Sequence, residues 1–268
     1  YNTNSGSGSL EVDDFVFALS GGDATLSSTT PSSISINGNE YTLGISLSGT
    51  PNGSETLTVN PVSSSIYDLA GNVASTSQSN NSISLNDKLG PTMTISSSTV
   101  NSGETSNDST ISLTFTSSES TTNFVKDDIT ISSGSLSSLS GSGTTYTATL
   151  TPSGDATYTI SVAQNTFTDS SNNNNSASNT FTWTYDSTAP TITGVTLASD
   201  NTTITVTFSE AVYNTNSGSG SLEVSDFIFA LSGGTATLSN TTPSSISING
   251  NEYTLGISLS GTPNGSET

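Results

Sequence analysis

Apolar and polar residues alternate in short runs along the whole chain. One run contains Ile34 and Ile36, another begins at Tyr41, and Asn37-Gly38 lies between them. Alternation with a period of two predicts strands with one buried face, and Asn-Gly between two such runs is typical of a hairpin with a type I′ turn. Runs of the same kind occupy residues 111–115, 146–150, 158–162, 181–185 and 204–208. No segment has a helical period, so we expect an all-β protein.

One long stretch of the sequence occurs twice. Residues 213–268 repeat residues 1–56, so that Tyr213 repeats Tyr1 with a period of 212 residues. The copies differ at four pairs of positions: Asp13/Ser225, Val16/Ile228, Asp23/Thr235 and Ser28/Asn240. Repetition on this scale indicates an array of similar units.

The pattern predicts three domains of two related types. We expect an incomplete domain at residues 1–86 (type A, lacking its first strands), a complete domain at 87–186 (type B), and an incomplete one at 187–268 (type A, lacking its last strands). The types are related because Asp68 aligns with Asp169, and because both linkers, at 87–91 and 186–190, read Asp-x-x-x-Pro. About seven short strands per roughly 100 residues predict immunoglobulin-like β-sandwiches in an extended tandem array.

Composition narrows the classes of function. Only 29% of residues are hydrophobic, a level that leans toward disorder, but their alternation favours a folded chain. Two lysine or arginine residues oppose 22 acidic ones, giving a net charge of −20. This balance argues against nucleic acid and anionic membranes as partners, and no apolar run is long enough to insert in a membrane.

The residue types needed for most catalytic sites are missing. The sequence has no cysteine and no histidine, so neither disulfides nor a nucleophile–histidine pair can form. The acidic residues fall in loops at the domain junctions, whereas glycoside hydrolysis needs two acids facing a cleft. We therefore expect no enzymatic activity and no catalytic residues.

Several short motifs occur in a fixed order. Residues 91–186 contain Ser118-Glu119, Asp-Asp-Ile at 127–129 and Gly-Thr-Thr-Tyr-Thr-Ala-Thr, while the type A segments contain TFSEAV, VSDF and DLAGN. The combination resembles the tandem bacterial Ig-like repeats of giant biofilm-associated and gliding-type surface adhesins. That resemblance implies an extracellular, cell-surface stalk that serves cell adhesion, is often stiffened by calcium between domains, and has no catalysis.

Three acidic residues are expected to meet at the first junction. In a sandwich of this kind the B–C and F–G loops lie at the pole where the chain enters. Glu119 ends the second strand of its domain, Asp169 opens the F–G loop, and Asp87 lies in the entering linker. Unneutralised carboxylates repel one another, whereas Ca²⁺ takes 6–8 oxygen ligands, which could include Asn173. We expect an interdomain Ca²⁺ site here; the alternative is a set of solvated acidic loops.

A second set repeats the arrangement at the next junction. Asp186 corresponds to Asp87 of the linker, and Glu210 corresponds to Glu119. The third ligand would be the aspartate of a DLAGN motif one period further on. In the copy of that motif present here, this aspartate is Asp68. The sets differ in one respect. Glu119 lies four residues after the last apolar residue of its strand, whereas Glu210 lies two after it.

Another aspartate recurs at the entry to a strand. Asp14, Asp127 and Asp226 are assigned to one equivalent position, and we expect each to accept a local backbone N–H bond, as aspartate often does in turns.

These features favour a structural stalk or spacer whose partners are the neighbouring repeats. Two alternatives remain open: a module that binds surface glycans, and a subunit of a self-assembling extracellular filament that contacts other chains.

Overall fold

A computed structural model describes residues 1–216 and 218–268. The chain divides into two compact units, Tyr1–Asp186 and Ser187–Thr268. Within the described residues the only helical elements are three 3₁₀ turns, η1 (Val12–Asp14), η2 (Lys126–Asp128) and η3 (Val224–Asp226), and none of them is long and apolar enough to cross a membrane. The prediction of an all-β protein is confirmed.

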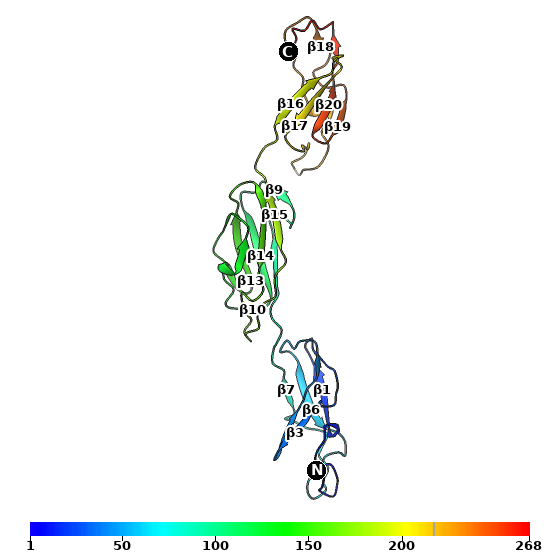
Figure 1. Cartoon of the computed structure of the whole chain (residues 1–268), viewed down its shortest axis with the longest axis vertical. Coiled ribbons are helices and arrows are strands. Elements are labelled where there is room, and N and C mark those ends of the chain that lie inside the picture. The colour runs from blue at the N-terminus through cyan, green and yellow to red at the C-terminus, as the bar shows by residue number, and fades with distance from the viewer. Residues whose placement is uncertain (217) are drawn as a thin grey trace. The chain divides into compact units, whose positions relative to one another are not determined.

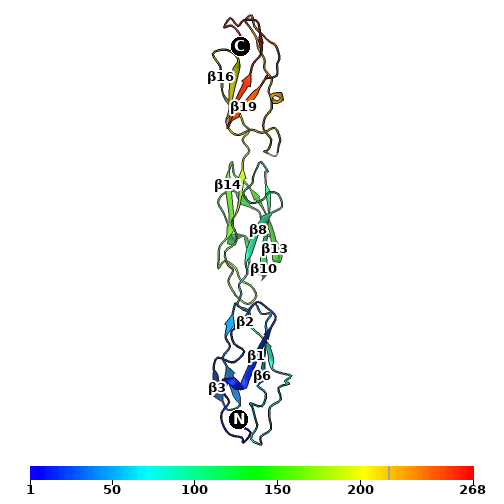
Figure 2. The same ribbon diagram turned by 90° about the vertical axis from the view of Figure 1, so that its right-hand side faces the viewer.

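Residues 93–185 form a sandwich of two four-stranded sheets (Figure 1, green). The strands are β8 (Met93–Ser97), β9 (Thr105–Ser106), β10 (Ile111–Thr121), β11 (Ile129–Ile131), β12 (Ser135–Leu136), β13 (Ser140–Thr151), β14 (Ala156–Val162) and β15 (Phe181–Tyr185). One sheet has the order β12-β13-β10-β8 and the other β11-β14-β15-β9. All neighbours are antiparallel except β9 and β15, which are parallel. Figure 2 shows β14 on one side and β8, β10 and β13 on the other.

The core of this sandwich lies between its sheets. Inward residues of β10 alternate with exposed ones, and Ile111, Leu113 and Phe115 are fully buried. Trp183 is also buried, and its indole N–H donates to Ser106 Oγ at 3.0 Å. The apolar rows of the sequence therefore form the core, because a period of two puts every second side chain on one face.

Residues 1–86 contain three small sheets. The strands are β1 (Phe15–Ser20), β2 (Thr25–Leu26), β3 (Ile34–Asn37), β4 (Glu40–Leu43), β5 (Leu47–Ser48), β6 (Thr56–Pro61) and β7 (Ser82–Ser84). They pair as β1-β6-β7, β2-β5 and β3-β4.

The β3–β4 hairpin forms, but its turn differs from the prediction. Asn37 pairs with Glu40, so the two-residue loop is Gly38-Asn39. Of these two residues only Gly38 has a positive φ, at 63°. A type I′ turn needs positive φ at both central residues, so that prediction is wrong; glycine at the first central position is the preference of type II′.

Residues 187–268 contain one four-stranded sheet and one two-stranded sheet. The strands are β16 (Ile192–Leu197), β17 (Thr203–Phe208), β18 (Thr237–Leu238), β19 (Ile246–Asn249), β20 (Glu252–Gly256) and β21 (Leu259–Ser260). The orders are β16-β17-β20-β19 and β18-β21.

The two copies of the duplicated stretch have different neighbours. In the second copy β20 pairs with both β17 and β19, whereas its counterpart β4 pairs only with β3. In the first copy β1 pairs with β6, whereas the counterpart residues 227–232 form no strand in the described structure. No sheet of the described residues contains strands from both sides of residue 87; the division into three domains stays a prediction.

Candidate metal centre

Glu119 extends the inward-facing row of β10. The row comprises residues 111, 113, 115, 117 and 119, so an even spacing from Phe115 keeps Glu119 on the core side of the strand. Glu119 lies within β10, whereas Glu210 lies two residues beyond the end of β17, so strand alternation places only Glu119 on the core side.

Asp169 is held by its own loop, between β14 and β15. One carboxylate oxygen, Oδ1, accepts the backbone N–H groups of Ser171 at 2.8 Å and Asn173 at 2.9 Å. The other, Oδ2, accepts from the Asn173 side-chain amide at 2.9 Å. Asn172 adopts a left-handed φ of 64°, which lets this tight loop close. Asp169 is buried, and its orientation is set before any ligand arrives.

Asp87 lies in the linker, which is fastened on both sides. The Lys88 N–H donates to Pro51 O at 2.8 Å, and the Ser176 N–H donates to Pro91 O at 3.0 Å. Between these contacts the backbone at Gly90 comes so close to the 173–174 loop that a Cβ there would lie 2.0 Å from Asn174 O. Glycine is required at this position, because only a residue without a side chain allows the approach.

The three carboxylates converge. One oxygen each from Asp87, Glu119 and Asp169 lie within 4.8 Å of one another, and no other group of three metal-binding side chains occurs among the described residues. Glu119 Oε1 is buried without any hydrogen-bond partner. Burial, followed by the negative charges of Asp87 and Asp169, raises the pKa of the Glu119 carboxyl. The cluster thus brings like charges together at a partly desolvated point, an arrangement that a cation would relieve.

The donor set matches Ca²⁺ in both type and spacing. Oxygens bound to one Ca²⁺ lie about 2.4 Å from the ion, and so no more than about 4.8 Å from one another. All three side chains offer carboxylate oxygen, the ligand of hard cations, and the chain has no histidine or cysteine for softer metals. Because Asp169 already satisfies backbone donors, it would bring a preorganised oxygen to the ion.

The three remaining predicted ligands, Asp68, Asp186 and Glu210, lie on separate segments of the chain. Asp68 sits in a loop that copies the Asp169 loop: it accepts from the N–H groups of Ala70 at 2.9 Å and Asn72 at 2.8 Å, and from the Asn72 side chain at 2.8 Å. Asp186 and Glu210 belong to different units, so the second metal site stays a prediction.

The strand-entry aspartate is confirmed at two of its three positions. Asp14 Oδ2 accepts the Glu11 N–H at 2.8 Å and Asp226 Oδ2 accepts the Glu223 N–H at 2.7 Å. In the middle domain, however, Asp128 accepts the Val125 N–H at 2.8 Å, so the assignment to Asp127 was wrong by one residue. The sequence held a signal that was missed: Asp14 and Asp226 each directly precede an apolar strand residue, as Asp128 precedes Ile129.

Sequence reasoning also missed a buried asparagine beside the site. Asn175 Oδ1 accepts the N–H groups of Thr166 at 2.8 Å and Phe167 at 3.0 Å, while its amide donates to Ala163 O and Ser176 O, each at 2.8 Å. It ties together both ends of the loop that carries Asp169. The run of asparagines at 172–175 concealed it, because all four look alike in the sequence.

Comparison with known proteins finds a similarity in the middle of the chain. A family model described as a bacterial Ig-like domain matches residues 87–185. No curated protein matches the chain. The match agrees with the sandwich geometry, and the Ig-like fold predicted for these residues is confirmed.

Proposed function

We propose that this chain is a structural spacer in the stalk of a large extracellular bacterial surface adhesin, and that Ca²⁺ stiffens the junction before residue 91. The proposal rests above all on one observation. Carboxylates from the linker, from β10 and from the β14–β15 loop meet at one point, where Glu119 Oε1 is buried without a partner. The bacterial Ig-like match and the all-β fold are compatible with a surface structural module.

The ion would act on the linker. Asp87 lies next to Lys88, whose N–H donates to Pro51 O, and three residues before Gly90, which packs against the 173–174 loop. Without a cation, the negative charges of Glu119 and Asp169 repel Asp87 and favour conformations in which the linker moves away. With Ca²⁺ bound, the same three groups share one ion, so the linker loses that freedom. The three carboxylates, which repel one another without the ion, are each attracted to the bound Ca²⁺. This change does not require either adjoining domain to refold.

An extracellular location suits such a site. Calcium sites of extracellular modules have dissociation constants of about 10⁻⁴ to 10⁻³ M, which match the calcium concentration outside cells. A net charge of −20 keeps a long repetitive chain soluble and limits non-specific adhesion between stalks. The role is mechanical rather than catalytic. Glycan binding and filament formation remain the alternatives.

The test is a calcium titration with a charge-matched control. We would compare the full chain with its Glu119→Gln and Glu40→Gln variants, because Glu40 lies on the β3–β4 hairpin and outside the cluster. Isothermal titration calorimetry with millimolar Ca²⁺ should show at least a tenfold loss of affinity for Glu119→Gln only. Small-angle scattering should show a narrower distribution of dimensions for the wild-type chain in Ca²⁺ than in EDTA.

Two results would contradict the proposal. Equal calcium affinity of the three proteins would contradict the metal site at Glu119. Superimposable scattering profiles with and without Ca²⁺ would contradict a mechanical role for the ion. Binding of an isolated glycan to the chain would favour the first alternative.

A further inference from the structure

The inward row of β10 changes from apolar to polar as it approaches the three carboxylates. Ile111, Leu113 and Phe115 are fully buried, but the next inward residue is Ser117, which is 3% exposed, and the row then reaches Glu119. A polar residue at a core position costs free energy unless it has a partner or serves a function. An apolar residue at position 117 would have continued the pattern of the strand.

The Ser117 hydroxyl differs from the other buried polar groups. Five other buried polar or charged residues each have a hydrogen-bond partner: Asp14, Glu55, Thr121, Asp169 and Asn175. Within the described residues, only two buried side-chain nitrogen or oxygen atoms have none, Ser117 Oγ and Glu119 Oε1. The two residues are two positions apart in one strand, so both of these oxygens belong to the same face of β10.

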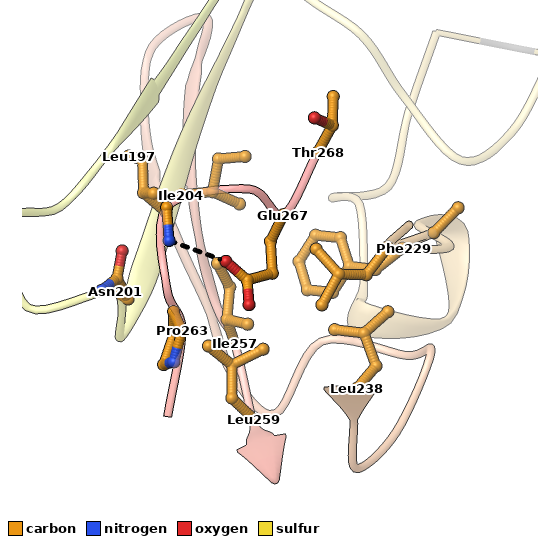
Figure 3. Close-up of a pocket in the computed structure, with 13 residues that line it drawn as sticks. Leu197, Asn201, Ile204, Phe229, Leu238, Ile257, Leu259, Pro263, Glu267 and Thr268 are labelled. Atoms are coloured by element: carbon orange, nitrogen blue, oxygen red, sulfur yellow. Dashed lines mark hydrogen bonds between the residues drawn. The ribbon is translucent and has the colours of Figure 1, made fainter. Parts of the chain in front are cut away.

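The chain satisfies other inward glutamates with its own backbone. Glu55 is fully buried and accepts the N–H of Ala24 at 3.0 Å. Glu267, its counterpart in the repeat, accepts the N–H of Gly265 at 3.0 Å, the dashed line in Figure 3. Backbone hydrogen bonds lower the pKa of both carboxyls, whereas burial raises the pKa of Glu119. The fold therefore has a way to satisfy an inward carboxylate by itself, and does not use it at Glu119 Oε1.

A β-bulge separates this part of β10 from β13. The ladder between the two strands stops at Thr116↔Thr145 and resumes at Thr121↔Gly143, so residues 117–120 stand opposite one residue of β13. Bulges are frequent next to functional sites, where they change the direction of a side chain. The polar end of the inward row thus coincides with an irregularity of the sheet.

We propose that Ser117 is a positioning residue of the metal site, whose hydroxyl holds a water ligand of the ion from the core side. Ca²⁺ takes 6–8 oxygen ligands, water among them, so three carboxylates leave room for further oxygens. Inward residues two apart in a strand are separated by about 6.8 Å, a gap that one bridging water spans and the short serine side chain does not. The same water would satisfy both oxygens that have no partner in the fold. The inference rests on the proposed function, because the water is a ligand of that ion.

Ser117→Ala separates this role from simple packing. We would titrate the full chain, Ser117→Ala and Ser112→Ala with Ca²⁺ by isothermal titration calorimetry; Ser112 is exposed on the same strand and serves as the control. Loss of a group that orients a metal ligand typically weakens binding by about tenfold or more. We expect a loss of about tenfold for Ser117→Ala and no change for Ser112→Ala.

Melting in EDTA gives the second measurement. Ser117→Ala should melt at the wild-type temperature or above it, because a methyl group replaces a buried hydroxyl that has no partner in the fold. Weaker calcium binding without a loss of stability in EDTA is a combination that a purely structural serine would not give.

Three results would overturn the inference. Equal calcium affinity of Ser117→Ala and the wild-type chain would do so and leave the metal site itself standing. A lower melting temperature of Ser117→Ala in EDTA would show that the hydroxyl has a partner within the fold. Calcium binding by none of the three proteins would overturn the proposed metal site, and this inference with it.

Discussion

Tyr41 and Tyr253 occupy the same position in the two copies of the duplicated stretch, yet Tyr41 is 38% exposed and Tyr253 is 3% exposed. Their sequence surroundings are identical from residue 29 to residue 56 of the first copy. The difference comes from β17, which pairs with the strand of Tyr253 and brings the Phe208 ring 5.6 Å from the Tyr253 ring. The strand of Tyr41 has no such neighbour among the described residues.

The two tyrosines should respond differently to removal. Tyr253→Ala should lower the free energy of unfolding of residues 187–268 by about 3 kcal/mol, because it removes a buried ring that packs against Phe208. Tyr41→Ala should cost about 1 kcal/mol or less, since much of that ring already contacts water. Differential scanning calorimetry of the two variants would compare the shifts in melting temperature, and equal shifts would contradict the burial difference.

The pKa of Glu119 predicts an unusual pH dependence in the absence of metal. Its pKa is raised in the folded state above the ordinary 4.5, so between these two values the folded protein binds more protons than the unfolded chain. The stability of residues 87–185 in EDTA should therefore increase as the pH falls from neutral toward 4.5. Asp68, whose pKa is lowered by hydrogen bonds from Asn72, acts in the opposite sense, but only as the pH falls below about its ordinary value of 3.8.

Urea unfolding at several pH values would measure this effect. Glu119→Gln should abolish the rise in stability between neutral pH and 4.5, and saturating Ca²⁺ should do the same by keeping the carboxylate ionised. A flat profile for the wild-type chain in EDTA would contradict a raised pKa of Glu119.

The strand-entry assignment can be tested with adjacent residues. Asp128→Ala removes the acceptor of the Val125 N–H and should cost about 1 kcal/mol, as for the loss of a helix cap. Asp127→Ala removes an exposed carboxylate and should change stability by less than about 0.5 kcal/mol. Chemical denaturation of both variants would decide between them, and the reverse order would restore the original assignment to Asp127.

Asn175 should matter for both stability and metal binding. Asn175→Ala leaves the buried N–H of Phe167 without its acceptor and should cost about 2 kcal/mol or more. Since the same side chain ties the ends of the Asp169 loop, calcium affinity should fall as well. The control is Asn174→Ala, whose side chain is exposed, and it should leave both properties unchanged. Unfolding curves and calcium titrations of the two variants check this pair.

Much of the metal cluster was accessible from the sequence. The expected topology placed Glu119 at the end of its strand near the entering linker, and the alignment of Asp68 with Asp169 identified two loops that the structure shows to have the same hydrogen bonds. Local chemistry of this kind repeats wherever the residues repeat. The choice among four consecutive asparagines depends on backbone angles, which identical neighbouring residues do not reveal.

The sequence by itself determined the strands, the repeat and the residue types that gather at the first junction, because each depends on spacing within one segment. Tertiary structure alone decided how deeply Tyr41 and Tyr253 are buried. The physical reason is that a strand is completed by hydrogen bonds and side chains from a distant segment, so identical sequences reach different burial when their neighbours differ.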